Sequence, residues 1–362
     1  MKIMHLEASH GWGGQEIRIL SEAIGMREKG HKIFFAIEPS GKLLMKARQE
    51  GFIAYGVHFT KKWWLISFFR LVWLIYRHDI EIINTHSSLD AWLGGIVGKL
   101  LRRAVIRTRH LSTAIKKGWN SRILYHHLAD FVVTTCKAIA SVIARQSGKN
   151  LERCLSIPTG VNPIKIDYNP RKTKSFREKI GISETDFLVG MVCFMRSWKG
   201  IKEFMEAALR LKAFKDIKWV IIGGGHSDTY IRMAKDMGLE DTIIFTGHLD
   251  EPFDAINALD VFVLLSTANE GVSQASLQAA FLKKPLITTR TGGLKEVCLN
   301  NISGIQVDKH APDQVVEAVI KLKENDSLRQ RLGKGARELV LKHFTYDKML
   351  TDMEQVYQLV KQ

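Results

Sequence analysis

The sequence lacks several features that mark particular classes of protein. Its 362 residues contain only four cysteines (Cys136, Cys154, Cys193 and Cys298), and none of them are spaced as CxxC. This argues against a disulfide framework and against a zinc site, and it is typical of a reducing compartment. The N-terminus is too poor in apolar residues for a signal peptide, and no low-complexity segment or heptad run occurs. We therefore expect a globular protein of the cytoplasm.

The chain has an excess of positive charge, and most of it lies in the first half. The formal net charge is +16. Residues 1–163 carry 24 lysines and arginines against 11 acidic residues, whereas the remainder carries 29 against 26. A basic half-molecule attracts a polyanion, which can be nucleic acid, an anionic membrane face or an anionic acceptor molecule. Charge alone does not choose among these three.

Short β-branched runs alternate with longer amphipathic stretches, and this pattern predicts βαβ units with a mostly parallel sheet. Strands are predicted at 2–6, 32–37, 80–85, 104–108, 130–135, 154–157, 187–194, 217–222, 242–246, 260–265, 285–288 and 304–307. Helices are predicted at 14–29, 90–101, 137–147, 201–213, 228–237, 273–283 and 312–323.

Two domains are expected, with the boundary in the segment 158–163. Proline and glycine interrupt the pattern there, and the following 15 residues are polar and basic. The domains are therefore 1–163 and 164–344. In doubly wound domains the ligands bind at the carboxyl ends of the strands, so these ends should lie on either side of a crevice.

The most informative segment follows the strand predicted at 260–265. Glu270 and Gly271 precede Val272 and a helix that begins near Ser273. Such a turn presents free backbone N–H groups and the positive end of a helix dipole to phosphate oxygens. Glu270 can accept hydrogen bonds from sugar hydroxyls, and Gln278 can reach a ribose. The alternative is an ordinary capped helix beside a surface glutamate.

This segment, continued by 284–297, resembles the family 4 retaining glycosyltransferases of GT-B fold. The resemblance implies an α/β protein with two Rossmann-like, doubly wound domains facing each other across a cleft. In that family two acidic residues are separated by seven others. The first contacts the donor sugar, and Glu270 matches it. The second holds the nucleotide ribose, and Gln278 stands there, with weaker hydrogen bonds than a carboxylate would make.

Two cations follow the strand predicted at 187–194, namely Arg196 and Lys199. They suit a diphosphate whose negative charge grows as the sugar leaves. The family has its arginine five residues before the lysine, where this chain has Phe194, so Lys199 matches the family better than Arg196 does. For both cations the alternative is a solvated surface charge.

Further landmarks of the family lie in the second domain and at the C-terminus. Gly224 resembles the glycine turn below the nucleotide, and Gly247 and His248 resemble the loop whose backbone reads the base. The segment 345–362 resembles the closing helix that crosses back onto the first domain. The motif Asp-x-Asp, with which the other major glycosyltransferase fold binds a divalent cation, is absent. We therefore expect no metal and no resident cofactor.

The first domain supplies a glycine loop. Gly13, Gly14 and Glu16 follow the first strand and resemble the family's loop near donor phosphate and acceptor. The spacing GxGxxG is missing, so a nicotinamide site is a weak interpretation.

Three further polar residues follow strands of the first domain. His110 follows the strand 104–108, where the family often has a histidine that touches the donor sugar. His86 and Asp90, with Glu16, are the acceptor-side candidates. A purely structural role is the alternative for each of these residues.

The segment 61–77 combines tryptophan and phenylalanine with lysine and arginine, but it is too short to span a bilayer. Its composition suits a helix docked on an anionic membrane at Trp63 and Trp64. The alternative is a helix that faces the core, and both can hold if only the Trp63–Trp64 end is exposed.

Together these features predict a glycosyltransferase that transfers a sugar from a nucleoside-diphosphate sugar to an acceptor hydroxyl, and the resemblance implies that the anomeric configuration is retained. Glu270, His110 and Lys199 are the expected catalytic residues. A UDP-sugar is the first choice of donor and a GDP-sugar the second. The acceptor is expected to be an anionic or lipid-linked glycan, as in lipopolysaccharide assembly at the inner membrane face. The alternatives are a sugar-nucleotide epimerase of the same fold and a basic nucleic-acid-binding protein.

Overall fold

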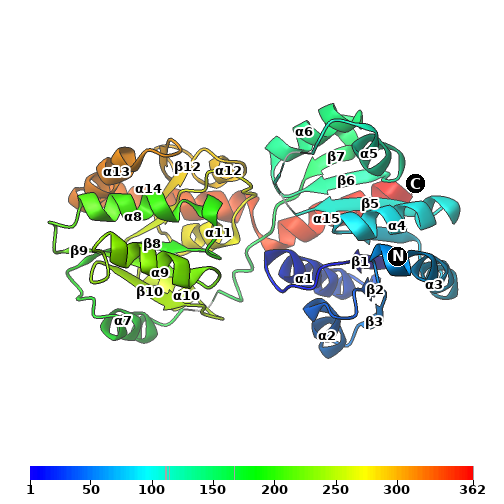
Figure 1. Ribbon diagram of the computed structural model, residues 1–362, viewed down its shortest axis with the longest axis horizontal. Coiled ribbons are helices and arrows are strands. Elements are labelled where there is room, and N and C mark those ends of the chain that lie inside the picture. The colour runs from blue at the N-terminus through cyan, green and yellow to red at the C-terminus, as the bar shows by residue number, and fades with distance from the viewer. Residues whose placement is uncertain (111, 114, 167, 362) are drawn as a thin grey trace. The chain divides into compact units, whose positions relative to one another are not determined.

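The computed structural model describes residues 1–110, 112, 113, 115–166 and 168–361. The chain divides into two compact units, which are described separately (Figure 1). Unit 1 comprises Met1–Thr159 and Asp347–Gln362, and unit 2 comprises Gly160–Tyr346. The division falls inside the segment 158–163, where proline and glycine interrupt the sequence pattern. Of the closing helix expected at 345–362, only Gln362 lies outside the described residues.

Unit 1 is built on a seven-stranded, fully parallel sheet with the strand order β3-β2-β1-β4-β5-β6-β7. Its strands are β1 (Lys2–Glu7), β2 (Lys32–Ile37), β3 (Ile53–Gly56), β4 (Ile82–Thr85), β5 (Ala104–Arg109), β6 (Phe131–Thr134) and β7 (Cys154–Ser156). The sequence pattern missed β3, because this four-residue edge strand is short and exposes Ile53 to solvent.

The helices of unit 1 follow the strands in regular alternation. They are α1 (Gly14–Glu28), α2 (Lys42–Gln49), α3 (Trp64–His78), α4 (Ser88–Leu100), α5 (Trp119–Ser121), the π-helical η2 (Arg122–His127), α6 (Lys137–Ser147) and α15 (Tyr346–Lys361). In Figure 1 the red helix α15 lies beside the strands of unit 1. Its fully buried Tyr357 donates a hydrogen bond to Glu22 in α1 at 2.6 Å and accepts one from Asn84 in β4 at 3.0 Å. The C-terminal helix is therefore part of the core of unit 1.

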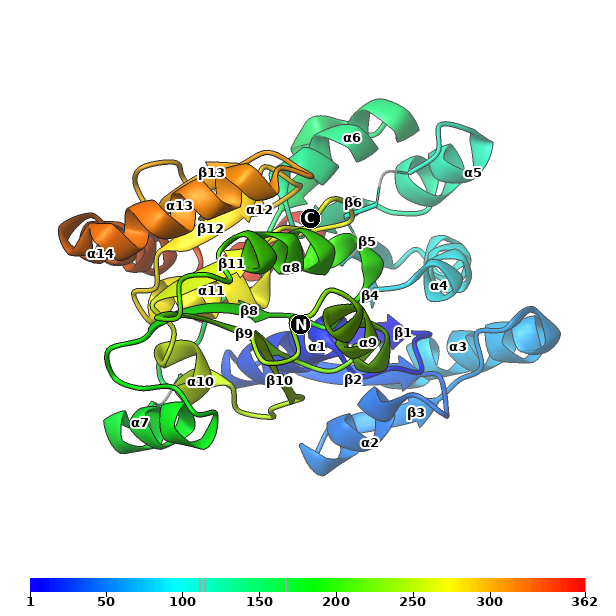
Figure 2. The ribbon, with the colours of Figure 1, turned by 60° about the vertical axis from the view of Figure 1, so that its left-hand side comes forward.

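Unit 2 has a six-stranded parallel sheet with the strand order β10-β9-β8-β11-β12-β13. Its strands are β8 (Phe187–Val192), β9 (Ile217–Ile222), β10 (Ile243–Gly247), β11 (Val261–Leu264), β12 (Leu286–Thr289) and β13 (Gly304–Val307). Its helices are α7 (Pro170–Lys179), α8 (Ile201–Arg210), α9 (Ser227–Asp236), α10 (Phe253–Asn257), α11 (Gln274–Phe281), α12 (Leu294–Val297), α13 (Pro312–Glu324) and α14 (Asp326–His343). Figure 2 shows α8 and α13 together, and α11 packs with α14.

The strand orders place one topological switch point in each unit. In unit 1 the chain moves outward from β1 in one direction to β3 and in the other direction from β4, and in unit 2 it does the same from β8 and β11. At such a point the loops after two neighbouring strands diverge to opposite faces of the sheet and leave a crevice at the carboxyl edge. This edge is where each unit is expected to bind its ligand.

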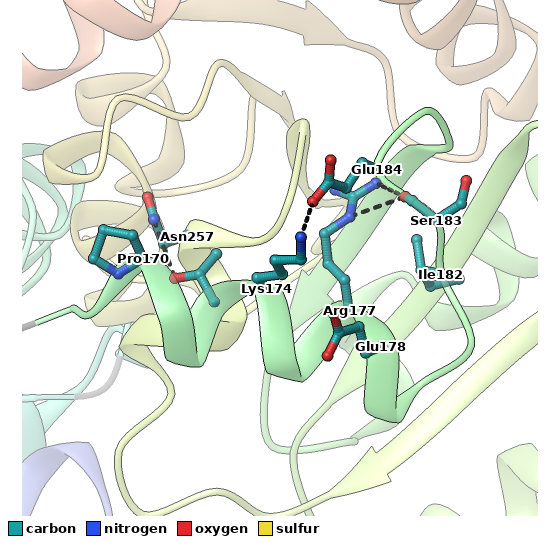
Figure 3. Close-up of a pocket in the computed structure, with 9 residues that line it drawn as sticks. Pro170, Lys174, Arg177, Glu178, Ile182, Ser183, Glu184 and Asn257 are labelled. Atoms are coloured by element: carbon teal, nitrogen blue, oxygen red, sulfur yellow. Dashed lines mark hydrogen bonds and ion pairs between the residues drawn. The ribbon is translucent and has the colours of Figure 1, made fainter.

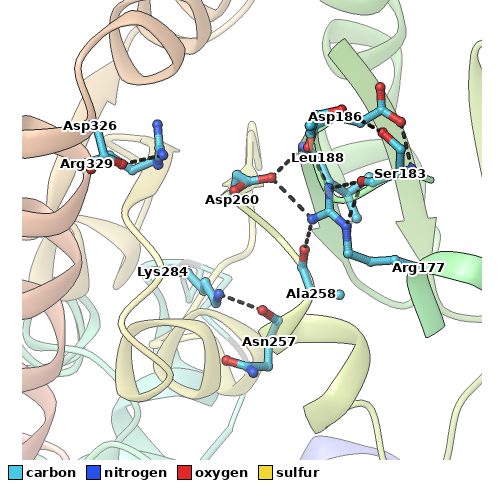
Figure 4. Close-up of polar contacts among 11 residues, drawn as sticks. Arg177, Ser183, Asp186, Leu188, Asn257, Ala258, Asp260, Lys284, Asp326 and Arg329 are labelled. Atoms are coloured by element: carbon cyan, nitrogen blue, oxygen red, sulfur yellow. Dashed lines mark hydrogen bonds and ion pairs between the residues drawn. The ribbon is translucent and has the colours of Figure 1, made fainter. Parts of the chain in front are cut away.

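At the opposite, amino edge of unit 2, half-buried cations bind backbone carbonyls and a carboxylate (Figure 4). Arg177 in α7 donates to the backbone carbonyls of Ala258, Ser183 and Asp186, at 2.7, 2.9 and 2.5 Å. These bonds hold α7, which the sequence pattern did not predict as a helix, since the segment is polar and has no buried residue. Asn257 also donates to the hydroxyl of Thr173 at 3.3 Å, so polar contacts and not a buried apolar stripe attach this helix.

Lys284, which begins the turn into β12, is the second cation at this edge. Its Nζ donates to the carbonyl oxygen of Asn257 at 2.6 Å. Burial lowers the pKa of its amine to about 8, partly offset by Asp260. The folded unit therefore releases this proton at a lower pH than the unfolded chain does.

We predict that this amine makes unit 2 more stable as the pH rises from about 8 toward 10. The unfolded chain still binds the proton there while the folded chain has released it, so the free energy of unfolding should rise by about 2 kcal/mol between about pH 7.5 and 9.5. Urea unfolding at the two pH values measures this, and Lys284→Met should remove the increment. The neighbouring exposed Lys283→Met is the matched control, and an equal increment in Lys284→Met would contradict the prediction.

Candidate active site

An ion pair joins two loops at the carboxyl edge of unit 2. Nζ of Lys199, which follows β8, lies 3.1 and 2.8 Å from the two carboxylate oxygens of Glu270, which follows β11. Ser266 donates its hydroxyl to the same carboxylate at 2.5 Å. The side chains are only 17% and 8% exposed, respectively. Two residues that are 71 positions apart are thus brought together at the switch point of the sheet.

Glycines hold the backbone of this site where any side chain would collide. Gly200 (φ 74°) lies against Leu265, and a Cβ atom there would stand 2.1 Å from the Leu265 carbonyl oxygen. Gly292 (φ 53°) lies against Glu270, where a Cβ atom would stand 1.8 Å from the carbonyl oxygen. The amide of Gly293 also donates to that oxygen at 3.1 Å. The turn that carries Glu270 is therefore fixed by backbone-to-backbone contact.

A helix begins directly after the turn that carries Glu270. α11 begins after Ser273, whose hydroxyl accepts a hydrogen bond from the amide of Ser276 at 3.3 Å. Val272 is buried and Gly271 is half-buried. The side chain of Gln278 is half-buried in the second turn of this helix. The N-terminal amides of α11 and the glutamine are thus both close in sequence to the ion pair.

Arg196 is less well placed than Lys199. It is exposed, and its guanidinium lies over the rings of Phe194 and Trp198, at 5.2 and 5.1 Å from their centroids. Phe194, which occupies the position of the family's arginine, is itself 56% exposed. The rings of Phe194 and Trp198 therefore hold Arg196, the second cation of this loop.

The loops after β9 and β10 lie next to each other. The amide of Gly223 donates to the carbonyl oxygen of Gly247 at 2.9 Å, and Gly247 has a positive φ of 74°. A Cβ atom on Gly224 would lie 3.6 Å from Cβ of His248, so the predicted glycine turn and base-reading loop form one surface. The ring of His248 is exposed and lies 3.4 Å from Asp250.

In unit 1, two of the acceptor-side candidates bind backbone amides. Glu16 accepts from the amide of Gly13 at 2.8 Å, while Gly14 begins α1. Asp90 accepts from the amide of Ser87 at 2.9 Å and from the amide of Ala8 at 3.1 Å. Both carboxylates thereby stabilise the N-terminal turn of a helix.

Sequence reasoning missed a buried carboxylate beside these residues. Glu7 ends β1, accepts from Gln15 at 2.5 Å and from the amide of Ser9 at 2.8 Å, and is fully buried. The pKa of Glu7 is raised to about 6. Burial is the cause of the increase, and the hydrogen bonds from Gln15 and Ser9 offset part of it. Burial also raises the pKa of Asp90, and the negative charge of Glu7 adds to this effect. An acidic residue at the end of an apolar strand was the available signal.

The two histidine candidates of unit 1 lie together. His86 follows β4 and His110 follows β5, and Nδ1 of His86 lies 3.0 Å from Nε2 of His110. The structure places a third histidine, His5 of β1, next to His86. The sequence pattern did not single it out, because it lies inside an apolar strand. Burial lowers the pKa of all three imidazoles.

A pocket of about 530 Å³ lies elsewhere in unit 2, along α7 (Figure 3). Its walls carry the ion pair of Lys174 with Glu184, at 2.7 Å. Ser183 and Glu184 precede β8, so the pocket belongs to the amino edge of the sheet and contains none of the predicted site residues. In the part of the chain that the structure describes, no three His, Cys, Asp or Glu side chains are grouped as ligands for a metal ion.

Two family models match the chain. The model for "Glycosyl transferases group 1" matches residues 172–339, and the model for "Glycosyltransferase Family 4" matches residues 12–165. Among curated proteins, N-acetyl-alpha-D-glucosaminyl L-malate synthase of Bacillus anthracis is 26% identical over 78% of this chain and 75% of its own length. The capsular polysaccharide biosynthesis glycosyltransferase CapM of Staphylococcus aureus is 23% identical over 81% of this chain and 80% of its own.

Solved structures agree in fold. A glycosyltransferase from Rickettsia africae ESF-5 matches with a TM-score of 0.91 and 19% identity, over 99% of this chain and 98% of that one. Anabaena Alr3699/HepE in complex with UDP matches with a TM-score of 0.87 and 17% identity, over 99% and 100%. The fold is GT-B, as the sequence predicted. The chain belongs to the group 1, family 4 glycosyltransferases, and it is a glycosyltransferase.

We predict that Gly292→Ala displaces the turn that carries Glu270. The new methyl group would collide with the Glu270 carbonyl, so the free energy of unfolding of unit 2 should fall by about 3 kcal/mol or more, and amides 270–273 should exchange hydrogen faster. Gly181→Ala is the control, since Gly181 has a similar φ of 72° and nothing within 4 Å of its added methyl group. It should cost only about 1 kcal/mol. Equal costs for the two variants would contradict the role of Gly292.

Proposed function

We propose that the chain transfers a sugar from a nucleoside-diphosphate sugar to an acceptor hydroxyl with retention of the anomeric configuration, and that it needs no metal ion. The observation that carries this proposal is the pair of Lys199 and Glu270 at the switch point of unit 2, ahead of the N-terminus of α11. A cation and free helix amides suit a leaving diphosphate. A carboxylate suits the hydroxyls of the donor sugar.

The roles of the side chains follow from their contacts. Glu270 would accept hydrogen bonds from sugar hydroxyls, and its bonds to Lys199 and Ser266 hold it in one orientation. Lys199 and the α11 amides would stabilise the negative charge that develops on the departing phosphate. Gln278 would bind the ribose. Unit 2 is thus the proposed donor unit and unit 1 the proposed acceptor unit, with His110 as the proposed contact to the sugar.

UDP is the proposed nucleotide. Anabaena Alr3699/HepE, which shares the fold, is described in complexes with UDP and with UDP-glucose. None of the neighbours described here supports GDP, the second expectation. The epimerase and nucleic-acid alternatives are not favoured, since the family models and curated relatives are those of glycosyltransferases.

We predict that Lys199→Ala weakens the binding of UDP about 10- to 100-fold, because a charge-assisted hydrogen bond to phosphate is lost. Titration calorimetry without metal measures the affinity. Lys202→Ala is the control, since Lys202 lies one turn along, at the start of α8, and pairs only loosely with Glu206, at 3.9 Å. Unchanged affinity in Lys199→Ala would contradict the donor site. Glu270→Gln should keep UDP binding but abolish transfer.

The proposed acceptor is an anionic or lipid-linked glycan, met at an anionic membrane surface on the cytoplasmic side. CapM, a relative, is named for capsular polysaccharide biosynthesis, and a fold neighbour, WaaG, for lipopolysaccharide biosynthesis. No helix among the described residues is long and apolar enough to cross a bilayer.

The exposed surface of α3 supports contact with a membrane. Its buried side faces the core with Leu71, Leu74 and Ile75, whereas large apolar side chains cover the opposite side. These are Trp63, Trp64, Leu65, Ile66, Phe69, Trp73 and Tyr76, which are between 36% and 81% exposed. The expectation that only the Trp63–Trp64 end would be exposed is therefore wrong, because the exposed apolar face runs the length of the helix.

The charges around this face match an anionic bilayer. Lys61 and Lys62 precede the helix, Arg70 and Arg77 lie within it, and no acidic residue occurs from 61 to 78. Aromatic side chains partition into the headgroup region while neighbouring cations pair with anionic lipid phosphates. We therefore propose an anionic lipid surface as the occupant of the apolar face of α3.

We predict that the double variant Phe69→Glu, Trp73→Glu loses binding to vesicles of phosphatidylglycerol and phosphatidylcholine by about tenfold or more. Vesicle flotation measures binding, and vesicles of phosphatidylcholine alone should bind weakly even to the unaltered chain. Phe214→Glu in unit 2, whose side chain is 48% exposed, is the matched control. If the double variant bound as well as the control, the proposed docking face would be wrong.

A further inference from the structure

Three histidines form a continuous chain along the carboxyl edge of unit 1; His5 and His86 are buried and His110 is half-buried. His5 lies in β1, His86 follows β4 and His110 follows β5, and these three strands are neighbours in the sheet. Nδ1 of His5 lies 2.9 Å from Nε2 of His86, and Nδ1 of His86 lies 3.0 Å from Nε2 of His110. The order of the histidines therefore follows the order of the strands.

The rings meet edge to edge, as hydrogen-bonded imidazoles do. The ring centroids of His5 and His86 are 5.1 Å apart with planes inclined by 7°, and those of His86 and His110 are 5.2 Å apart with planes inclined by 33°. In each pair the facing nitrogens are far closer together than the ring centres. The bonds thus lie between the rings, near their planes, where the lone pairs and N–H groups point.

All three imidazoles are neutral near pH 7. Burial lowers the pKa of His5 to about 4 and takes the pKa values of His86 and His110 well below the ordinary range. The guanidinium of Arg18 lowers the pKa of all three further, whereas Glu22 raises that of His5. A neutral imidazole has one N–H donor and one acceptor nitrogen.

The hydrogen bonds therefore link the three tautomers. Either every ring carries its proton on Nδ1 or every ring carries it on Nε2, because a mixed chain would oppose two N–H groups or two lone pairs. Nε2 of His5 is buried and has no hydrogen-bond partner among the described residues. Orphaned buried N–H groups are rarer than under-satisfied acceptors, so the Nδ1–H arrangement is favoured.

We infer that His5 and His86 are positioning residues that hold His110 in the tautomer with its proton on Nδ1. The far end of the chain then presents an N–H donor to the ligand, which suits an oxygen of a sugar hydroxyl. This inference rests on the proposed function only in taking the donor sugar as the ligand of His110. The linkage of the tautomers stands on the two nitrogen–nitrogen distances and on the neutrality of the rings, and it does not depend on the ligand.

The test is nitrogen NMR of the protein labelled with 15N at histidine, since the shifts of the two ring nitrogens report which one carries the proton. We expect Nδ1–H for all three linked rings in the unaltered protein. In His86→Phe, which removes both bonds, His110 should lose its single tautomer and show a mixture of the two forms. His58→Phe is the control, because His58 is partly exposed and bonds Glu38 outside the chain of histidines.

A second variant keeps the test decisive if His86→Phe does not fold. His5→Phe removes only the far end, and it should release the direction of the remaining bond between His86 and His110. An unchanged Nδ1–H tautomer of His110 in the folded variants would overturn the inference. So would a mixture of tautomers for His110 in the unaltered protein.

Kinetics with UDP-glucose as donor test separately whether the tautomer of His110 matters for sugar transfer. We expect His86→Phe to lower kcat roughly tenfold or more while UDP affinity stays unchanged, since a wrong tautomer misdirects the proton. Loss of UDP affinity with unchanged kcat would overturn a positioning role. If the unaltered protein transferred no sugar from any donor, the proposed function would fail while the NMR result still decided the linkage of the tautomers.

Discussion

The parallel order of the strands is the constraint on which the rest of this structure depends. When all strands of a sheet run in one direction, every loop that follows a strand emerges at the same edge. Lys199 and Glu270 are 71 residues apart in the chain, yet they follow neighbouring strands, β8 and β11, and so their side chains meet. The same rule aligns His5, His86 and His110 across β1, β4 and β5. Side chains that are far apart in the sequence come together because the strands that carry or precede them are neighbours in the sheet.

This constraint explains why much of the candidate site was predictable from sequence. Polar residues in the loops that follow apolar strands, such as His86, His110 and Glu270, could be recognised because the strands themselves were clear. Residues inside strands were not recognisable in this way. His5 lies inside β1, where side chains alternate between faces, and its role depends on which strands pair with β1. That pairing is a tertiary fact, which the local pattern does not contain.

The misses have a common physical cause. α7 has no buried apolar stripe, and polar contacts attach it, among them the hydrogen bonds of Arg177 to three backbone carbonyls. β3 is a short edge strand with one exposed isoleucine, so alternation gives little signal. The exposed side of α3 could be taken for core in the sequence, since hydropathy does not show which apolar side chains of a helix are buried. Periodicity fails wherever something other than the protein's own apolar core stabilises the element.

The two edges of unit 2 hold their half-buried cations in different ways. At the amino edge, Arg177 is bound by carbonyl oxygens on several elements, so its bonds are used up in holding the fold. At the carboxyl edge, Lys199 meets a single carboxylate, on a loop held by glycine contacts. An ammonium group has three donor hydrogens, and a phosphate can replace or share the carboxylate without breaking any secondary structure. A rigid loop with an exchangeable ion partner is the arrangement that binding a charged substrate requires.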